Sequence, residues 1–234
     1  RVLAEAARTF ATPQIRNVAS IGGNLCQDVR CWYYRYPSHT GGPIQCLRKG
    51  DGPCLAVRGD NRYHAIMEGK KCFAVCPSDT AVALAALDAT IHVSGPECDR
   101  SIAADDFFSP LANALKVNEI VTKIEIPALK HPTKQKFIKF TLRKPVDFAI
   151  VSVASVTAIE NGTCIDVRIA LGGVAPGPVR ARAAEDMLKG KEMNETHVLE
   201  AANLALSAAK PLSMNSYKIE ITKPLIKRAL LGGG

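Results

Sequence analysis

The sequence predicts an α+β fold, mainly because a hairpin is followed by helices. Apolar residues dominate 151–160 and 164–171, and these segments flank Asn161-Gly162, the strongest short pattern for a tight β-hairpin. Helical composition follows at 182–189, 196–210 and 216–231. With one more strand at 136–142, three strands would carry helices packed on one face, which is typical of the α+β class.

The earlier part of the chain mixes both kinds of element. Residues 1–10 (RVLAEAARTF) fit an amphipathic helix and lack the basic start and long apolar run of a signal peptide. Ser78 is a good N-cap for a helix over 80–88, because its hydroxyl can accept a bond from a first-turn N–H. Alternating apolar and polar residues predict strands at 91–94 and 120–126.

A proline-containing connection divides the chain into two predicted parts. Pro127, His131 and Pro132 interrupt the strand pattern. We therefore expect one part at 1–130, with an insertion at about 26–76, and a second part at 135–234. Pro224 could divide or delay the last helix of the second part.

Composition excludes several classes of protein. The chain has 234 residues, 47% hydrophobic and 22% charged, which is typical of a globular protein with a substantial core and not of a disordered chain. No apolar run approaches the roughly 18 to 20 residues of a membrane span. The net charge of +8 comes without a run of five like charges or interleaved aromatic and basic residues, so we expect no nucleic-acid partner.

The cysteines are unevenly distributed, since six of the eight lie between Cys26 and Cys76. A disulfide framework is typical of small secreted chains that lack a core, and this chain has enough apolar residues to form one, which disfavours disulfides. Structural zinc sites pair ligands two to four residues apart, a spacing that only Cys72 and Cys76 show. A larger iron-sulfur cluster can be held by well-separated thiolates, on a backbone that glycines such as Gly41 and Gly42 allow to turn.

Four cysteines suit the arrangement for a cluster: Cys31, Cys46, Cys54 and Cys72. Seven basic and three acidic residues between the first and last of them leave a local charge of +4, which would stabilise negatively charged thiolates. Spacing alone leaves zinc and an iron-sulfur cluster both open.

A glycine pair precedes the cysteines. Gly22 and Gly23 lie between Ser20 and Asn24, and the backbone N–H groups of such a turn can point together at an anion such as a diphosphate. A Gly-Gly pair is weak evidence by itself, because an ordinary turn at a strand end has the same composition.

Four segments in order carry a family resemblance: 17–24 (NVASIGGN), 77–79 (PSD), 119–127 (EIVTKIEIP) and the series Lys139, Arg143, Asp147. They resemble the FAD subunit of the molybdenum hydroxylases, which include xanthine dehydrogenase, carbon monoxide dehydrogenase and aldehyde oxidoreductases. The resemblance implies a middle subdomain of the FAD-binding type 2 (PCMH-like) fold. A C-terminal subdomain like that of the CO dehydrogenase flavoprotein, with a three-stranded sheet and helices, would follow.

The insertion adds to the resemblance. Residues 24–27 (NLCQ), 30–35 (RCWYYR) and 59–66 (GDNRYHAI) resemble the insertion of the subset whose FAD subunit also holds a 4Fe-4S cluster, as in periplasmic aldehyde oxidoreductases and 4-hydroxybenzoyl-CoA reductases. This implies that Cys31, Cys46, Cys54 and Cys72 are the metal ligands. Cys26 and Cys76 would be structural thiols, and we expect His64 to form a hydrogen bond within the insertion.

The resemblance also implies a set of FAD-binding residues: Ser20, Gly22, Gly23, Asn24, Asp79, Val121 and Lys139. The glycine turn would bind the diphosphate and ribitol, and Asp79 a ribose hydroxyl. Val121 would lie against the isoalloxazine and Lys139 near the flavin ring. Core packing explains Val121 nearly as well, and Arg143 with Asp147 could equally be a structural ion pair.

The implied function is electron transfer in an oxidoreductase complex, with no catalytic residue on this chain. FAD and the cluster would relay electrons between a 2Fe-2S small subunit, a molybdopterin-binding large subunit and an external acceptor or donor. The alternative is a zinc-stabilised interaction module without redox activity. We expect the family's N-terminal subdomain to be missing from this chain, and a cytoplasmic location or a periplasmic one reached by export with a partner.

Overall fold

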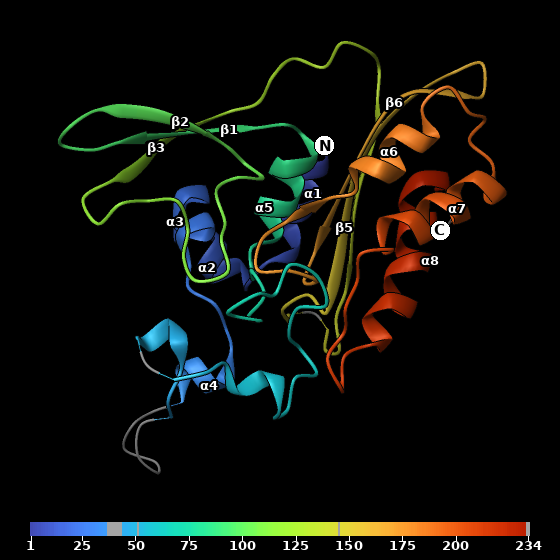
Figure 1. Cartoon of the computed structure of the whole chain (residues 1–234). Helices are drawn as coiled ribbons and strands as arrows, with labels where there is room; N and C mark the ends of the chain where they lie inside the picture. The colour runs from blue at the N-terminus through green and yellow to red at the C-terminus, as the bar shows by residue number, and fades with distance from the viewer. Residues whose placement is uncertain (37–43, 51, 145, 233–234) are drawn as a thin grey trace.

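The computed structural model describes residues 1–36, 44–50, 52–144 and 146–232 (Figure 1). Gly41 and Gly42 of the insertion lie outside these described residues. Strands and helices form two sheets with helical layers around the larger one, so the α+β class is confirmed.

The larger sheet is antiparallel and has the order β4-β5-β6-β7. Its strands are β4 (Lys134–Phe140), β5 (Val151–Glu160), β6 (Thr163–Gly172) and β7 (Val179–Arg180). Asn161 and Gly162 join β5 to β6 with φ values of 51° and 82°, as a tight hairpin turn requires. The predicted hairpin and three long strands are confirmed, and the two-residue β7 is an addition.

Helices cover both faces of this sheet. α6 (Arg182–Leu188), α7 (Glu195–Ala205) and α8 (Tyr217–Leu231) form one layer (Figure 1). α1 (Val2–Thr9) and α5 (Asp79–Ala86) pack on the other face, where Val2, Val82 and Ala154 share one apolar core. The predicted layer of C-terminal helices on one face is confirmed, and the two helices of the first part of the chain add a layer on the other face. A strand covered on both faces need not alternate buried and exposed residues, which explains why residues 151–158 of β5 are all buried.

α8 continues through Pro224 without a break. It supplies Leu225, Ile226 and Leu230 to the main core, so the apolar face of the helix outweighs the hydrogen bond that the proline removes. The predicted division of this helix is not observed.

A second sheet of three strands, in the order β2-β1-β3, extends from the helical layer (Figure 1). It consists of β1 (Thr90–Ser94), β2 (Asp99–Ala103) and β3 (Ile120–Glu125). The sequence predicts β1 and β3 but not β2, which has the polar start Asp-Arg-Ser and is held by its register against β1. Leu84, Ile91 and Phe107 form the core beneath this sheet.

The glycine pair lies in a helix and not in a turn after a strand. α2 (Pro13–Val18) precedes it, and α3 (Ile21–Cys26) contains both glycines. Ser20 starts α3, because its Oγ accepts a hydrogen bond of 3.0 Å from the backbone N–H of Gly23. An N-cap thus overrides the low helix propensity of two glycines.

The insertion between α3 and α5 contains short helical turns: α4 (Trp32–Arg35), η2 (Leu47–Lys49) and η3 (Leu55–Val57). Its second half docks on the start of α8. Asn61 donates to Ser213 Oγ and accepts from the N–H of Met214, while Asn215 donates to the carbonyl of His64. Among the described residues, no helix is long and apolar enough to cross a membrane.

Candidate functional site

The start of α3 forms an open backbone surface beside β3. Ser20 and Gly23 are exposed and Gly22 is half-buried. A Cβ atom placed on Gly22 would lie 3.7 Å from Cβ of Val121, so the glycine and the valine are in contact range. The structure therefore brings together Gly22 and Val121, which are about 100 positions apart in the predicted FAD-binding set.

Asn24 faces inward. Its Oδ1 accepts hydrogen bonds from Ser78 Oγ at 2.6 Å and from Thr80 Oγ1 at 2.5 Å, and all three side chains are buried. Ser78 also caps α5 by accepting from the N–H of Ala81. The side-chain oxygen of Asn24 thus ties the glycine segment to the start of α5 and is not available to a ligand.

Asp79 and Lys139 form a buried ion pair. Lys139 Nζ lies 2.6 Å from Asp79 Oδ2, with side-chain exposures of 6% and 4%. Lys139 Nζ also donates to the carbonyl of Thr9 at 3.1 Å. Burial raises the pKa of Asp79 and the Lys139 ammonium opposes that rise. The sequence suggested separate roles for these residues and missed the pair.

Arg143 and Asp147 are also paired, at 3.0 Å, but the arginine side chain is 78% exposed. The guanidinium lowers the pKa of Asp147 through a side-chain hydrogen bond. The structural ion pair considered from the sequence is therefore present. Both residues also line a cavity between the insertion and the larger sheet.

Three of the four predicted metal ligands lie near one another. Burial raises the pKa of the Cys31 thiol, and negative charge on Cys72 and Cys46 raises it further, whereas two backbone N–H groups of α4 lower it. Cys31 packs against Cys72 in a small apolar cluster. Cys54 begins η3 in a separate turn.

The thiols fit a cluster only in part. All four are free cysteines, and two of them, Cys46 and Cys72, are buried. Within the described residues, however, no three His, Cys, Asp or Glu side chains are grouped closely enough to hold a metal ion. The donor chemistry suits an iron-sulfur cluster, whereas the side-chain geometry is not that of an assembled metal site.

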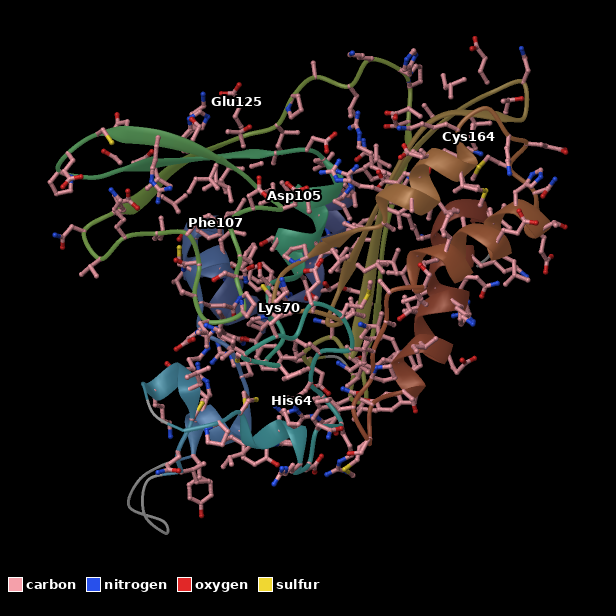
Figure 2. All side chains as sticks on the ribbon, in the orientation of Figure 1. His64, Lys70, Asp105, Phe107, Glu125 and Cys164 are labelled. Carbon is pink, nitrogen blue, oxygen red and sulfur yellow. The ribbon has the colours of Figure 1, made fainter. Side chains whose placement is uncertain are left out.

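His64 forms the predicted contact within the insertion. Its Nε2 lies 3.2 Å from Cys31 Sγ, and its ring packs edge-on against Trp32 with centroids 5.8 Å apart. His64 lies among the insertion side chains in the lower part of Figure 2. The histidine is thus placed to orient Cys31.

The remaining cysteines are separated from this group. Cys26 and Cys76 pack against the core beneath the second sheet, and burial raises the pKa of Cys76 to about 12. Cys164 is buried in the main core, and Cys98 is exposed. These positions are consistent with structural thiols.

A cavity of about 430 Å³ lies between the insertion and the larger sheet. We call it the insertion cavity. It is lined by residues of the insertion (Cys31, Trp32, Tyr63, His64), of the start of α5 (Ser78, Asp79) and of the 142–152 segment (Arg143, Phe148, Ser152). No local sequence pattern predicts this cavity, because its walls come from segments far apart in the chain.

Lys218 was also missed. This α8 residue is 1% exposed, and its Nζ donates to the carbonyls of Tyr63 at 3.2 Å and Gly173 at 2.6 Å. Burial lowers its pKa to about 7. Several charged residues are distributed along α8, and nothing in their order indicates that Lys218 is buried.

Comparisons with protein families match both parts of the chain. Residues 1–129 match the family described as the FAD binding domain in molybdopterin dehydrogenase. Residues 136–232 match the family described as the CO dehydrogenase flavoprotein C-terminal domain.

Individual proteins give the same result. The aldehyde oxidoreductase FAD-binding subunit PaoB of Escherichia coli K12 is 33% identical over 98% of this chain and 70% of its own length. The carbon monoxide dehydrogenase medium chain of Hydrogenophaga pseudoflava is 27% identical over 98% of this chain and 65% of its own length.

A solved structure of carbon monoxide dehydrogenase from Hydrogenophaga pseudoflava superposes with a TM-score of 0.71 at 28% identity. The superposition covers 98% of this chain and 66% of that chain. Almost the whole of this chain is therefore matched, but it spans only about two thirds of the length of these relatives.

Proposed function

The chain belongs to the family of FAD-binding subunits of molybdenum hydroxylases, and from that premise we propose that it transfers electrons through FAD and a 4Fe-4S cluster. The expected flavoprotein component of an oxidoreductase is thereby confirmed. Membership of this family does not favour the alternative of a zinc-stabilised interaction module.

The contact between Gly22 and Val121 is the observation that carries the flavin proposal. It joins the first turn of α3, where the exposed backbone of Gly23 leaves room for a close approach by phosphate, to an apolar side chain on β3. Ser20, Gly22, Gly23 and Asn24 would hold the diphosphate end of FAD, with Asn24 contributing through its backbone. Val121 would pack against the ring.

Asp79 and Lys139 would complete the flavin site as a pair. Their mutual distance of 2.6 Å means that a ribose hydroxyl bound by Asp79 and a flavin ring near Lys139 would belong to one connected hydrogen-bond network. When bound, FAD mediates between two-electron and one-electron carriers.

For the cluster, we propose Cys31, Cys46, Cys54 and Cys72 as ligands. The packing of Cys31 against the apolar cluster that contains Cys72, and the local charge of +4, support this set. His64 would hold Cys31 by its 3.2 Å contact, as a positioning residue. Cys54 would have to join the other three on assembly.

Partners follow from the same premise. We propose a molybdopterin-binding large subunit, a 2Fe-2S small subunit and an external acceptor or donor, with the chain placed in the cytoplasm or exported with a partner. Three apolar side chains of α2 and the start of α3, Ile15, Val18 and Ile21, are 41% to 87% exposed. We propose that the family's N-terminal subdomain covers them and completes the FAD site.

FAD affinity of two matched valine variants tests this function. The variants are made in the natural full-length protein. Val121→Ala should weaken FAD binding by about fivefold to tenfold, since about 1 kcal/mol of apolar contact is lost. Val117→Ala, at a fully exposed valine, should leave the affinity unchanged. Equal affinities for all three proteins, measured by flavin fluorescence, would contradict the proposed flavin site.

A further inference from the structure

The insertion cavity has two polar atoms without partners. His64 Nδ1 and Ser152 Oγ are buried and form no hydrogen bond with the described residues. Their residues are 3% and 1% exposed, and both line the cavity. An unpaired buried polar group costs about 1 to 3 kcal/mol, so a ligand that supplies hydrogen-bond partners here would remove a real penalty.

The apolar walls of the cavity are suited to a flat ring. Trp32 and Tyr63 pack edge-on with centroids 5.4 Å apart, and both line the cavity. Phe148 also lines the cavity and is 48% exposed, with the guanidinium of Arg30 5.3 Å from its ring centroid. Aromatic walls of this kind favour planar aromatic ligands by stacking and edge contacts.

The charges around the cavity disfavour a cation. Its two carboxylates are already paired, Asp79 with Lys139 and Asp147 with Arg143. Lys218 lies behind the wall, donating to the carbonyls of Tyr63 and Gly173, with no carboxylate partner in the described part of the chain. Arg30 also lines the cavity and forms no ion pair among the described residues, so the excess charge is positive and stabilises electron-rich oxygen atoms on a ligand.

We propose that the insertion cavity binds a planar aromatic compound with ring carbonyl oxygens, the chemistry of a quinone. The Ser152 hydroxyl would donate to one carbonyl. In the tautomer whose Nε2 accepts from the Cys31 thiol, His64 Nδ1 would donate to the other carbonyl. A volume of about 430 Å³ lies within the usual range of small-ligand sites, roughly 300 to 1,000 Å³. The cavity shares Asp79 with the proposed flavin site, and the inference goes beyond the proposed function because it concerns a second ligand whose binding needs no electron transfer.

Trp32 allows a direct test, because it is the only tryptophan in the chain. We would titrate the protein with 1,4-naphthoquinone and follow tryptophan fluorescence. Binding in the cavity predicts saturable quenching of the single emitter. Quenching that rises linearly with concentration, without saturation, would contradict binding at this site.

Serine variants identify the contact. Ser152→Ala removes the unpaired hydroxyl without adding volume and should weaken naphthoquinone binding by about tenfold, equivalent to about 1.4 kcal/mol. The matched control is Ser207→Ala, an exposed serine just beyond the end of α7 and outside the cavity lining, whose loss should leave binding unchanged. Equal affinities for both variants and the parent protein would overturn the assignment.

FAD supplies the last comparison. If FAD alone quenches Trp32 saturably and blocks naphthoquinone, the cavity belongs to the flavin site and the proposal is wrong. If naphthoquinone quenches Trp32 whether or not FAD is bound, the cavity is a separate site. Failure of the Val121 test with saturable naphthoquinone quenching would refute only the flavin site, so the two proposals fail independently.

Discussion

Lys139 Nζ lies 2.6 Å from Asp79 Oδ2, and this pair joins β4 to the first turn of α5 in the interior of the protein. Lys139 also donates to the carbonyl at the end of α1, so three elements meet at one ammonium group. The proposed flavin site is built on this junction.

Asp79→Asn should destabilise the protein by about 3 kcal/mol or more, because it leaves the Lys139 ammonium buried without its counter-ion. The double variant Asp79→Asn with Lys139→Met should recover much of that loss, since no unpaired charge remains. Urea unfolding of the three proteins measures both effects. A single variant as stable as the parent would show that the pair contributes nothing.

Lys218 predicts a pH dependence of stability. Its folded pKa of about 7 is below the unfolded value of 10.5, so between these values the unfolded state binds more protons. Stability from this group is therefore lost as pH falls towards 7 and is regained as pH rises, by at most about 1.4 kcal/mol per unit. His64, with a pKa lowered to about 4, stays neutral over this range.

The comparison with Lys218→Met isolates this effect. The difference in unfolding free energy between parent and variant should change in favour of the parent as pH rises from 7 to about 8.5, the interval below thiol titration. A difference that stays constant across this interval would mean that Lys218 is charged in the folded protein.

Asn61 fastens the insertion to the second part of the chain. It is fully buried, donates to the carbonyl of Ala56 and to Ser213 Oγ at 3.0 Å each, and accepts from the N–H of Met214 at 2.9 Å. Asn61→Ala should cost about 2 to 4 kcal/mol in chemical unfolding. Asn203→Ala, on the exposed side of α7, should be neutral or slightly stabilising.

Replacing one proposed ligand should remove iron. Cys72→Ser, at a buried thiol, should abolish cluster assembly measured as iron per chain after anaerobic purification. Cys98→Ser alters an exposed cysteine outside the insertion and should keep full iron content. Equal iron loss in both variants would show that the ligand set is wrong.

Features with local chemistry were predictable from the sequence. Asn161-Gly162 specifies the hairpin because few other residues adopt positive φ, and Ser78 marks the start of α5 through its hydroxyl. The helix of α3 was not predictable in the same way, because the N-cap bond of Ser20 had to compete with two glycines of low helix propensity.

Features made by distant residues could not be predicted. The Asp79–Lys139 pair joins positions 60 apart, and the insertion cavity combines His64 with Ser152. β2 depends on pairing with β1 more than on its own polar sequence. The candidate cysteine ligands and the glycine pair could be identified from residue type and order in the sequence. Which side chains they contact could be seen only in the folded structure.

The metal content of anaerobically purified protein tests the central claim most directly. Electron transfer through a cluster predicts about four irons and four acid-labile sulfides per chain, with visible absorbance that dithionite bleaches. Stoichiometric zinc without iron would contradict it and would support a structural metal site in the insertion.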